Sequence, residues 1–411
     1  MSRTAAPLPR LLLFALLAGS MISMISFGVR SAFGLFADPF SHSHNWPREI
    51  FAFSLAIQNI AWGLSQPIAG YIADRFGAFR VLVGGGIAYV AGMVWMIFGS
   101  HPIGIHMSAV LVGVGIGGAS FVTVVSVLTK IIPESHRAWA VGIGTAAGSL
   151  GQFLIVPLLQ IVIDSFGWVA GAWMAAAGLL TIPVLALVVR AASANPAAAG
   201  RANAAPLQGR SILQALKHPS YQLLVAGFFA CGFQLAFITA HFPMYLNDTG
   251  LGQGVASWAL ALIGLCNIIG TYVAGVLSGK YSKRLLLAWL YFARAALIAA
   301  FVATPPSSVS VLIFALCMGL TWLSTVPPTS GLIATFFGTS QLATLFGFAF
   351  LSHQVGAFLG VWMGAATFAA TGSYMMIWWA AAVVSVAAGL LHLPIRERAA
   401  PAWTFANSHP A

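Results

Sequence analysis

The chain has 411 residues, of which 60% are hydrophobic and only 6% are charged, and its mean hydropathy is +0.93. A soluble domain carries about 25% charged residues, so this chain has too little polar surface to coat a water-soluble globule of its size. A formal net charge of +11 would suggest a nucleic-acid partner in a soluble protein. The positions of the basic residues, described below, explain the charge without one.

The apolar residues form runs long enough to cross a bilayer, because a hydrocarbon core of about 30 Å needs roughly 20 helical residues. The first run follows Arg3 and Arg10 and is similar to a signal peptide, but it continues through Gly28 without a clean small-residue cleavage site. We therefore expect a retained first span. Charges, proline or glycine bound twelve predicted spans, near residues 11–37, 51–73, 81–99, 104–130, 138–163, 168–190, 220–245, 255–279, 285–303, 309–336, 343–370 and 374–393.

One low-complexity linker divides these spans into six and six. The predicted organisation is an N-terminal six-helix bundle over 1–190, a cytoplasmic linker over 191–217, a C-terminal six-helix bundle over 218–395 and a cytoplasmic tail over 396–411. The predicted fold class is thus all-α and integral to the membrane, with twelve transmembrane helices.

The basic residues predict the orientation. Of the 18 lysines and arginines, Arg30 and Arg294 fall inside predicted spans, and Arg48 alone falls in a predicted outer loop. The others all lie on the opposite side, which the positive-inside rule assigns to the cytoplasm. We therefore expect a multi-pass protein of the cell inner (plasma) membrane with both termini cytoplasmic.

Two features argue against cofactor chemistry. Cys231, Cys266 and Cys317 lie far apart in apolar runs, which is typical of buried membrane thiols and of neither a disulfide framework nor a metal site. The glycine-rich string at 113–118 fits a nucleotide-binding pattern only loosely and lies inside a span, so it predicts close helix packing. We expect no metal, no cofactor and no ATP-driven mechanism.

Similar segments end the second and eighth spans, as in a duplicated transporter fold. The first reads Gly70-Tyr-Ile-Ala-Asp74-Arg75-Phe-Gly77 with Arg80 following, and the second reads Gly275-Val-Leu-Ser-Gly279-Lys280-Tyr-Ser282. The first resembles the Gly-x-x-x-Asp-Arg-x-Gly signature of the major facilitator superfamily. The resemblance implies two pseudo-symmetric bundles and a cytoplasmic gate in which Asp74, Arg75 and Arg80 latch the outward-facing state. The small Gly70 would let helices approach, and Gly279 replaces the aspartate in the second copy.

Within that superfamily the chain resembles the monocarboxylate transporter and oxalate:formate antiporter branch over nearly its whole length. The residues that carry the resemblance are Gly28-Val-Arg30 through Asp38-Pro39, Ser65-Gln66-Pro67 and Gly347-Phe348 through His353-Gln354. The resemblance implies that Arg30 occupies a substrate-contacting position and that His353 stands where the oxalate antiporter has a carboxylate-binding lysine. The chain departs from the branch at Thr271, where an essential arginine is typical.

Arg30 is the leading candidate for substrate binding. An arginine at the centre of a span costs roughly 2.5–3.5 kcal/mol and needs a partner or a water-filled path. No carboxylate lies within one helical turn of Arg30. An unpaired guanidinium is suited to bidentate capture of a carboxylate. The alternative is that Arg30 reaches the outer headgroups.

Arg294 lies near the middle of the ninth span, and the second half has only Asp248 and Glu397 as acidic residues, both outside its spans. It is either functional or a structural arginine that clamps carbonyl groups at a broken helix. The paired prolines Pro327-Pro328 predict a bend in the tenth span, because proline removes a helical hydrogen bond and clashes with the preceding turn.

Histidines and amides complete the candidate site. His353 and His241 are candidates for anion contact and for proton coupling, because histidine titrates near neutral pH; the alternative is a packing role. Polar residues at helical spacing add Gln58, Gln234, Asn267 and Thr325, for which interhelical hydrogen bonding is the alternative.

We therefore predict a secondary active transporter of small, monocarboxylate-like organic anions, working by alternating access with proton symport or anion exchange. Arg30 and His353, one from each half, would anchor the anion, and the protein would be monomeric. An exporter of hydrophobic or other small molecules is one alternative, and a non-transporting receptor is another. An integral-membrane enzyme is more distant, since only His42 and His44 near Asp38 and Glu49 cluster, in a loop expected to be a solvated turn.

Overall fold

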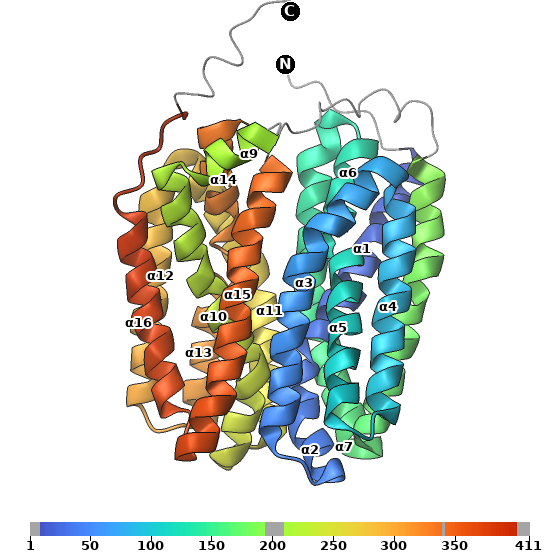
Figure 1. Cartoon of the computed structure of the whole chain (residues 1–411), viewed down its shortest axis with the longest axis vertical. Helices are drawn as coiled ribbons and strands as arrows, with labels where there is room; N and C mark the ends of the chain where they lie inside the picture. Colours follow the sequence, from blue (N-terminus) through green and yellow to red (C-terminus); the bar gives the residue numbers. More distant parts are fainter. Residues whose placement is uncertain (1–8, 194–208, 339–341, 401–411) are drawn as a thin grey trace, which may run out of the picture. The chain divides into compact units, whose positions relative to one another are not determined.

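The computed structural model describes residues 9–193, 209–338 and 342–400, and these residues are almost entirely helical, with no β-strand among them (Figure 1). The chain divides by its contacts into two compact units. Unit 1 comprises Met1–Asn203 together with Phe242–Leu265, and unit 2 comprises Ala204–His241 and Cys266–Ala411. Residues 242–265, which lie in the predicted C-terminal bundle, therefore pack with the first unit.

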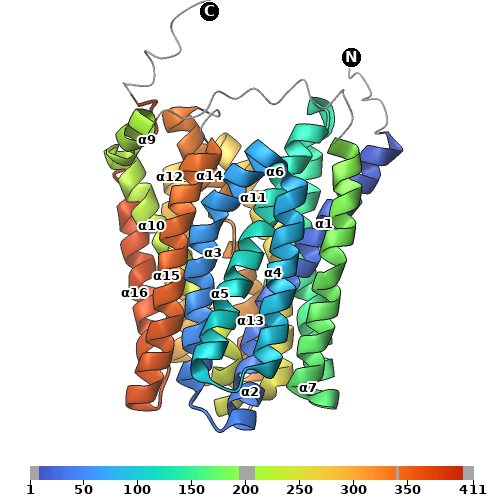
Figure 2. The same ribbon diagram turned by 45° about the vertical axis from the view of Figure 1, so that its right-hand side comes forward.

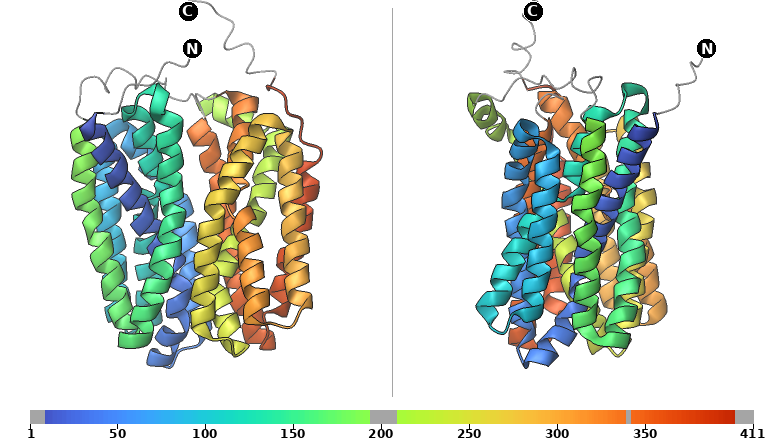
Figure 3. Two further views of the ribbon diagram at one scale, coloured as in Figure 1. Left: turned by 180° about the vertical axis from the view of Figure 1, so that it is seen from behind. Right: turned by 90° about the vertical axis from the view of Figure 1, so that its right-hand side faces the viewer.

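Unit 1 is built from long helices that pack along their lengths. Its elements are α1 (Arg10–Ser31), η1 (Phe33–Phe36), α2 (Ala37–His44), α3 (Arg48–Phe76), α4 (Ala78–Phe98), α5 (Pro102–Gly118), α6 (Phe121–Ile131) and α7 (Glu134–Ser193). Helix α5 packs against both α3 and α4 (Figure 2). Helix α1 lies along α7 (Figure 3).

Unit 2 takes most of the remaining helices, although α10 and α11 each continue into unit 1. The elements are α9 (Gly209–Leu216), α10 (Pro219–Asp248), α11 (Gly252–Lys280), α12 (Lys283–Ala303), α13 (Ser308–Thr321), α14 (Val326–Phe337), α15 (Leu342–Thr371) and α16 (Met375–His392). Helix α12 packs against α16 (Figure 1).

Ten helical segments of the described residues are long and apolar enough to cross a membrane. One of them contains Gly167, whose φ of 83° breaks α7 between the fifth and sixth predicted spans. Helix α3, which corresponds to the predicted second span, is not among these ten segments. It is 29 residues long, but the polar residues Gln58, Asn59 and Gln66 in its middle lower its mean hydropathy. The all-α membrane fold is confirmed.

The tenth predicted span, in which Pro327-Pro328 predict a bend, consists of two separate helices. Helix α13 ends at Thr321, and α14 begins at Val326 with proline in its first turn. A proline there lacks only an N–H that has no intrahelical partner in any case. Four residues between the two helices thus expose backbone groups that must find partners elsewhere in unit 2.

The glycines at 113–118 serve helix packing, as predicted. A Cβ atom on Gly113 would overlap the carbonyl oxygen of Gln58, and one on Gly115 would lie 2.5 Å from the backbone nitrogen of Tyr89. Gly151 likewise leaves no room for a Cβ beside the carbonyl of Met24. Such close approaches let the helices of unit 1 pack without a strong hydrophobic driving force between them.

Candidate functional site

Arg30 occupies the last turn of α1 and is only 9% exposed. Its Nη2 atom donates to Asn59 Oδ1 at 3.4 Å. The centre of its guanidinium lies 4.8 Å from the ring centre of Trp62 and 5.7 Å from that of Phe27. The cation therefore contacts one amide and two aromatic rings, which α1 and α3 contribute.

The partners of Arg30 are themselves held in place. Asn59 Nδ2 donates to the carbonyl of Leu55 at 2.8 Å, which turns Oδ1 toward the guanidinium. Trp62 Nε1 donates to Gln66 Oε1 at 3.0 Å, one helical turn further along α3. These two hydrogen bonds do not involve Arg30 itself. They fix the side chains of Asn59 and Trp62, which contact its guanidinium, so the polar stripe on α3 positions Arg30.

No carboxylate neutralises Arg30 among the described residues, because both ion pairs found in that part of the chain involve Arg48. An aromatic face stabilises a cation through its quadrupole and leaves the charge in place. The C-terminal end of α1 adds a favourable dipole. The arrangement retains a net positive charge and suits a planar anionic group.

Gln58 lies next to Asn59 on α3 and is buried. It is four residues from Trp62, so the two side chains leave the helix on a similar face. The predicted role of Gln58 in substrate binding stays a prediction.

In unit 2, Arg294 is fully buried and faces the break between α13 and α14. Its Nη2 donates to the carbonyl oxygens of Thr321 and of Trp322, the latter at 2.5 Å. Its Nη1 donates to Gln234 Oε1 at 3.4 Å. These contacts are those of the structural alternative: a cation that satisfies carbonyl groups at a helix end.

Asn267 and Thr325 belong to the same break. Asn267 Oδ1 accepts from the backbone N–H of Leu323 at 2.8 Å and from the Thr271 hydroxyl at 3.0 Å. The Thr325 hydroxyl lies 3.4 Å from the sulfur of Cys231, a buried thiol that sequence reasoning left out of the site. Three predicted site residues of unit 2, Gln234 included, thus converge on the interrupted helix.

Gln234 is a structural bridge as well, because its amide nitrogen donates to the Ala381 carbonyl at 2.9 Å and to the Ser385 hydroxyl at 2.7 Å. Both partners lie on α16. Its amide oxygen accepts a hydrogen bond from Arg294 on α12. The side chain of Gln234, on α10, therefore connects α10, α12 and α16. The hydrogen bonds of this side chain fit the interhelical alternative.

The two histidines differ in their surroundings. His353 Nδ1 lies 3.0 Å from Gln354 Oε1, and its ring packs between Phe228 and Phe350. His241 Nε2 lies 2.8 Å from the carbonyl of Val361, on the α15 side of unit 2. The structure therefore gives His241 the contacts of a packing residue.

The predicted gate motif spans the end of α3, the turn at Gly77 and the start of α4. Arg75 Nη1 donates to the Tyr71 hydroxyl at 2.7 Å, and Gly77 has a φ of +88°, which a residue with a Cβ rarely adopts. A Cβ on Gly70 would meet no atom within 4 Å, so the close helix approach expected there is not found. Arg80 is exposed. The side chain of Asp74 lies outside the described part of the chain.

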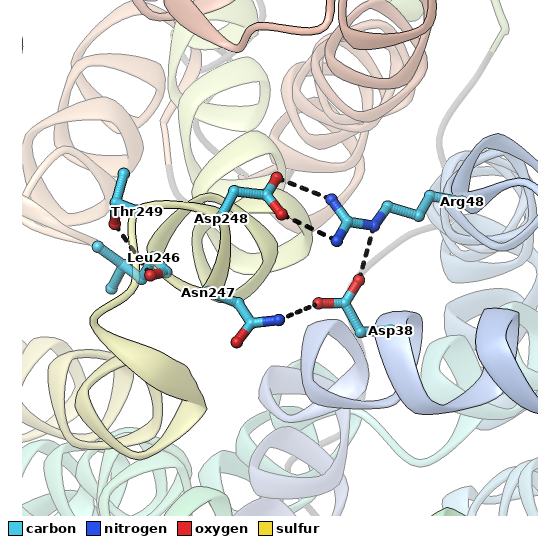
Figure 4. A network of polar contacts seen from close by, with 6 residues as sticks. All are labelled: Asp38, Arg48, Leu246, Asn247, Asp248 and Thr249. Atoms are coloured by element: carbon cyan, nitrogen blue, oxygen red, sulfur yellow. Dashed lines mark hydrogen bonds and ion pairs between the residues drawn. The ribbon is translucent and has the colours of Figure 1, made fainter.

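The outer loop expected to be a solvated turn is instead ordered by charge. Asp38 lies on α2 and is only 3% exposed, and Arg48 Nε approaches its Oδ1 at 2.8 Å (Figure 4). Arg48 also pairs with Asp248. Sequence reasoning missed this network because Asp248 is 200 positions away from Arg48.

Comparison with known proteins identifies the family. Residues 16–361 match the Major Facilitator Superfamily. The uncharacterised transporter YcxA of Bacillus subtilis is 26% identical over 90% of this chain and 91% of its own length. The oxalate:formate antiporter of Oxalobacter formigenes is 23% identical over 86% of this chain and 84% of its own, and mouse monocarboxylate transporter 11 is 26% identical over 64% and 57%. The chain belongs to the major facilitator superfamily.

Proposed function

We propose that this membrane transporter carries small organic anions with one carboxylate group, by alternating access between its two halves. Proton symport and anion exchange are the two coupling schemes. The observation that carries the proposal is the environment of Arg30, a buried cation that pairs with an amide and two aromatic rings and with no carboxylate of the described chain.

The contacts of the two intramembrane arginines support a substrate with a single carboxylate. Arg294 is engaged by two backbone carbonyls and Gln234, so its charge serves the protein. Arg30 retains its charge for a ligand. A dianion would need a second cation to balance its burial, since an unpaired charge in a low-dielectric site is costly.

The relatives add independent support. The matched proteins include a hexuronate transporter of Bacillus subtilis besides the oxalate:formate antiporter and the monocarboxylate transporters. All of these names specify organic acid anions. We extend that substrate class, and none of the individual substrates, to this chain.

His353 is the proposed second anchor and proton carrier. Its imidazole would donate to the anion when neutral and attract it more strongly when protonated. We further propose a monomer in the plasma membrane with both termini cytoplasmic, as the distribution of basic residues predicts. No nucleic acid or enzymatic activity forms part of this proposal.

An exporter of hydrophobic or cationic compounds is the second candidate from the sequence. A cation site would require an acidic residue within a span. Asp38 and Asp248 are paired with Arg48, and Asp164 accepts a hydrogen bond from Gln160 Nε2 at 2.7 Å. The anion proposal therefore accounts better for the charges.

Uptake into proteoliposomes tests the proposal. The purified chain is reconstituted, and labelled mono- and dicarboxylates are supplied with and without an inside-alkaline pH gradient, and with and without unlabelled acid inside. We expect saturable uptake of a monocarboxylate, accelerated by the gradient for symport or by internal acid for exchange. If none of the acids enters in any of these modes while empty liposomes behave identically, the anion proposal is wrong.

A further inference from the structure

A buried thiol lies at the break between α13 and α14 in unit 2. Cys231 belongs to α10 and is fully buried, whereas Cys266 is half-buried and Cys317 is exposed. The sulfur of Cys231 lies 3.4 Å from the hydroxyl oxygen of Thr325 and 3.9 Å from the carbonyl oxygen of Trp322. A buried cysteine in apolar surroundings is inert. The polar neighbours set this thiol apart from the other two.

A cation shares the same carbonyl with the thiol. Arg294 Nη2 donates to the Trp322 oxygen at 2.5 Å, so the guanidinium and the sulfur of Cys231 approach one oxygen atom. Arg294 Nε is buried and has no hydrogen-bond partner among the described residues. Both ion pairs found in that part of the chain belong to Arg48, so no carboxylate neutralises Arg294 there. A thiolate next to an arginine is stabilised by its charge, and Cys231 could supply the missing negative charge.

His353 reaches the thiol from α15. Its ring packs against that of Phe228, with 5.1 Å between the ring centres, and Phe228 lies one helical turn before Cys231 on the same face of α10. A Cβ atom on Gly232, the residue after Cys231, would overlap the carbonyl oxygen of His353. Helices α10 and α15 are therefore in contact on both sides of Cys231, and the imidazole makes a side-chain hydrogen-bond contact with the thiol.

The other contact of the imidazole determines which of its nitrogen atoms can take a proton. His353 Nδ1 lies 3.0 Å from Gln354 Oε1. An amide oxygen only accepts hydrogen bonds, so Nδ1 carries the hydrogen of the neutral ring and Nε2 is the acceptor. An imidazole that takes the proton of a neighbouring thiol is the arrangement that activates cysteine in enzymes. Cys231 and His353 can therefore pass one proton between Sγ and Nε2.

We propose that Cys231 and His353 form one proton site, and that this site couples proton movement to anion transport. With the proton bound, shared between Sγ and Nε2, the pair is neutral and Arg294 beside it keeps its positive charge. When the proton leaves to water, the thiolate balances Arg294. The protonated site is thus one charge more positive and attracts an anion more strongly. The inference rests on the proposed transport function and deepens it, because it gives His353 a thiol as its partner.

The other groups near the pair keep their protonation state at neutral pH. Tyr291 on α12 interacts electrostatically with Cys231 and with Arg294, and its ring centre lies 5.5 Å from the guanidinium. A phenol keeps its proton at neutral pH, and a guanidinium stays charged. The hydroxyl of Thr325 can donate to a thiolate and does not titrate. The thiol and the imidazole are therefore the groups of this cluster that can exchange a proton.

The ultraviolet absorbance of a thiolate tests the pair without any substrate. In the purified full-length chain, Cys266→Ser and Cys317→Ser leave Cys231 as the only thiol, and the further change Cys231→Ser gives the blank. We expect a thiolate signal above the blank at neutral pH, and a severalfold weaker signal in His353→Gln because the imidazole no longer takes the proton. Absorbance equal to that of the blank at neutral pH would overturn the proposal. If His353→Gln does not fold, the comparison with the blank alone decides.

Uptake into proteoliposomes then tests the coupling. The measured quantity is the ratio of monocarboxylate uptake rates with and without an inside-alkaline pH gradient. Cys231→Ser should lose the acceleration by the gradient, whereas the matched control Cys266→Ser should keep the parental ratio. Full acceleration in Cys231→Ser, or carboxylate uptake by the parent without any acceleration, would overturn the coupling role. If the parent carries no carboxylate, the substrate proposal fails, but the thiolate absorbance is measured without substrate, so the two failures are distinguishable.

Discussion

The guanidinium of Arg30 lies 4.8 Å from the ring centre of Trp62, and Trp62 is in turn fixed by a 3.0 Å hydrogen bond from Nε1 to Gln66. The indole supports the cation without neutralising it, because its ring carries a quadrupole and no formal charge. A buried arginine held in this way keeps its capacity to bind an anion.

Trp62→Leu should weaken substrate binding while leaving the maximal rate nearly unchanged. Loss of a desolvated cation–π contact is worth about 0.5–2 kcal/mol, so KM for uptake should rise roughly 2- to 30-fold. Trp95→Leu is the matched control, since Trp95 is an exposed tryptophan of the same unit. An unchanged KM in Trp62→Leu would mean that the indole does not position Arg30.

Arg294→Met should destabilise the fold more than it affects substrate specificity. The substitution leaves the carbonyls of Thr321 and Trp322 without their donor in a fully buried site, and each lost partner costs about 1–3 kcal/mol. We expect a clearly lower unfolding temperature in detergent. Arg294→Lys should recover part of the loss because it restores a cation. If Arg294→Met unfolds like the parent but no longer transports, Arg294 is functional rather than structural.

Gly232→Ala should disrupt the contact between α10 and α15. A Cβ on Gly232 would overlap the carbonyl oxygen of His353, whereas one on Gly347 of α15 would meet no atom within 4 Å. Overpacking of this kind costs roughly 1–3 kcal/mol. Gly347→Ala is therefore the control, and thermal unfolding of the two variants should differ by several degrees. Equal unfolding temperatures would contradict the close approach.

Glu397→Gln should lower stability at neutral pH but not in acid. Burial favours the protonated form of Glu397, but the Ser282 hydroxyl at 2.5 Å and the Arg284 N–H at 2.9 Å outweigh it and hold its pKa below the usual value. A carboxylate whose folded pKa is depressed stabilises the fold above its unfolded pKa of about 4.3, and the contribution is lost as pH falls through the folded pKa. Unfolding temperatures of the parent and the variant, measured from pH 7 down to pH 3, should therefore converge in acid. A constant difference across this range would mean that the charge of Glu397 does not bind the start of α12.

The features predictable from sequence are those encoded by local pattern. Apolar runs predicted the helical membrane fold, and the glycines at 113–118 predicted close packing. The prolines at 327–328 predicted a bend in the tenth span, and they lie in the first turn of α14. Each follows from a residue's own chemistry and its neighbours in the chain. The family signature at Gly70–Gly77 predicted the superfamily to which the chain belongs.

The partners of the charged residues could not be predicted in this way. The sequence raised carbonyl clamping as one of two roles for Arg294, but only the fold identifies Thr321 and Trp322 as acceptors. Arg48 and Asp248 meet because α10 carries its end into unit 1. Backbone acceptors and pairs 200 positions apart leave no local signature, so a search for nearby carboxylates does not find them.

Uptake by matched variants tests most directly whether Arg30 binds the carboxylate of the substrate. Initial rates of monocarboxylate uptake are compared for the parent, Arg30→Gln and Arg30→Lys in proteoliposomes with equal amounts of folded protein. Loss of a charge-assisted bidentate contact is worth about 1.5–3 kcal/mol, so kcat/KM should fall at least about tenfold in Arg30→Gln and less in Arg30→Lys. Uptake by Arg30→Gln at the parental rate would contradict the account.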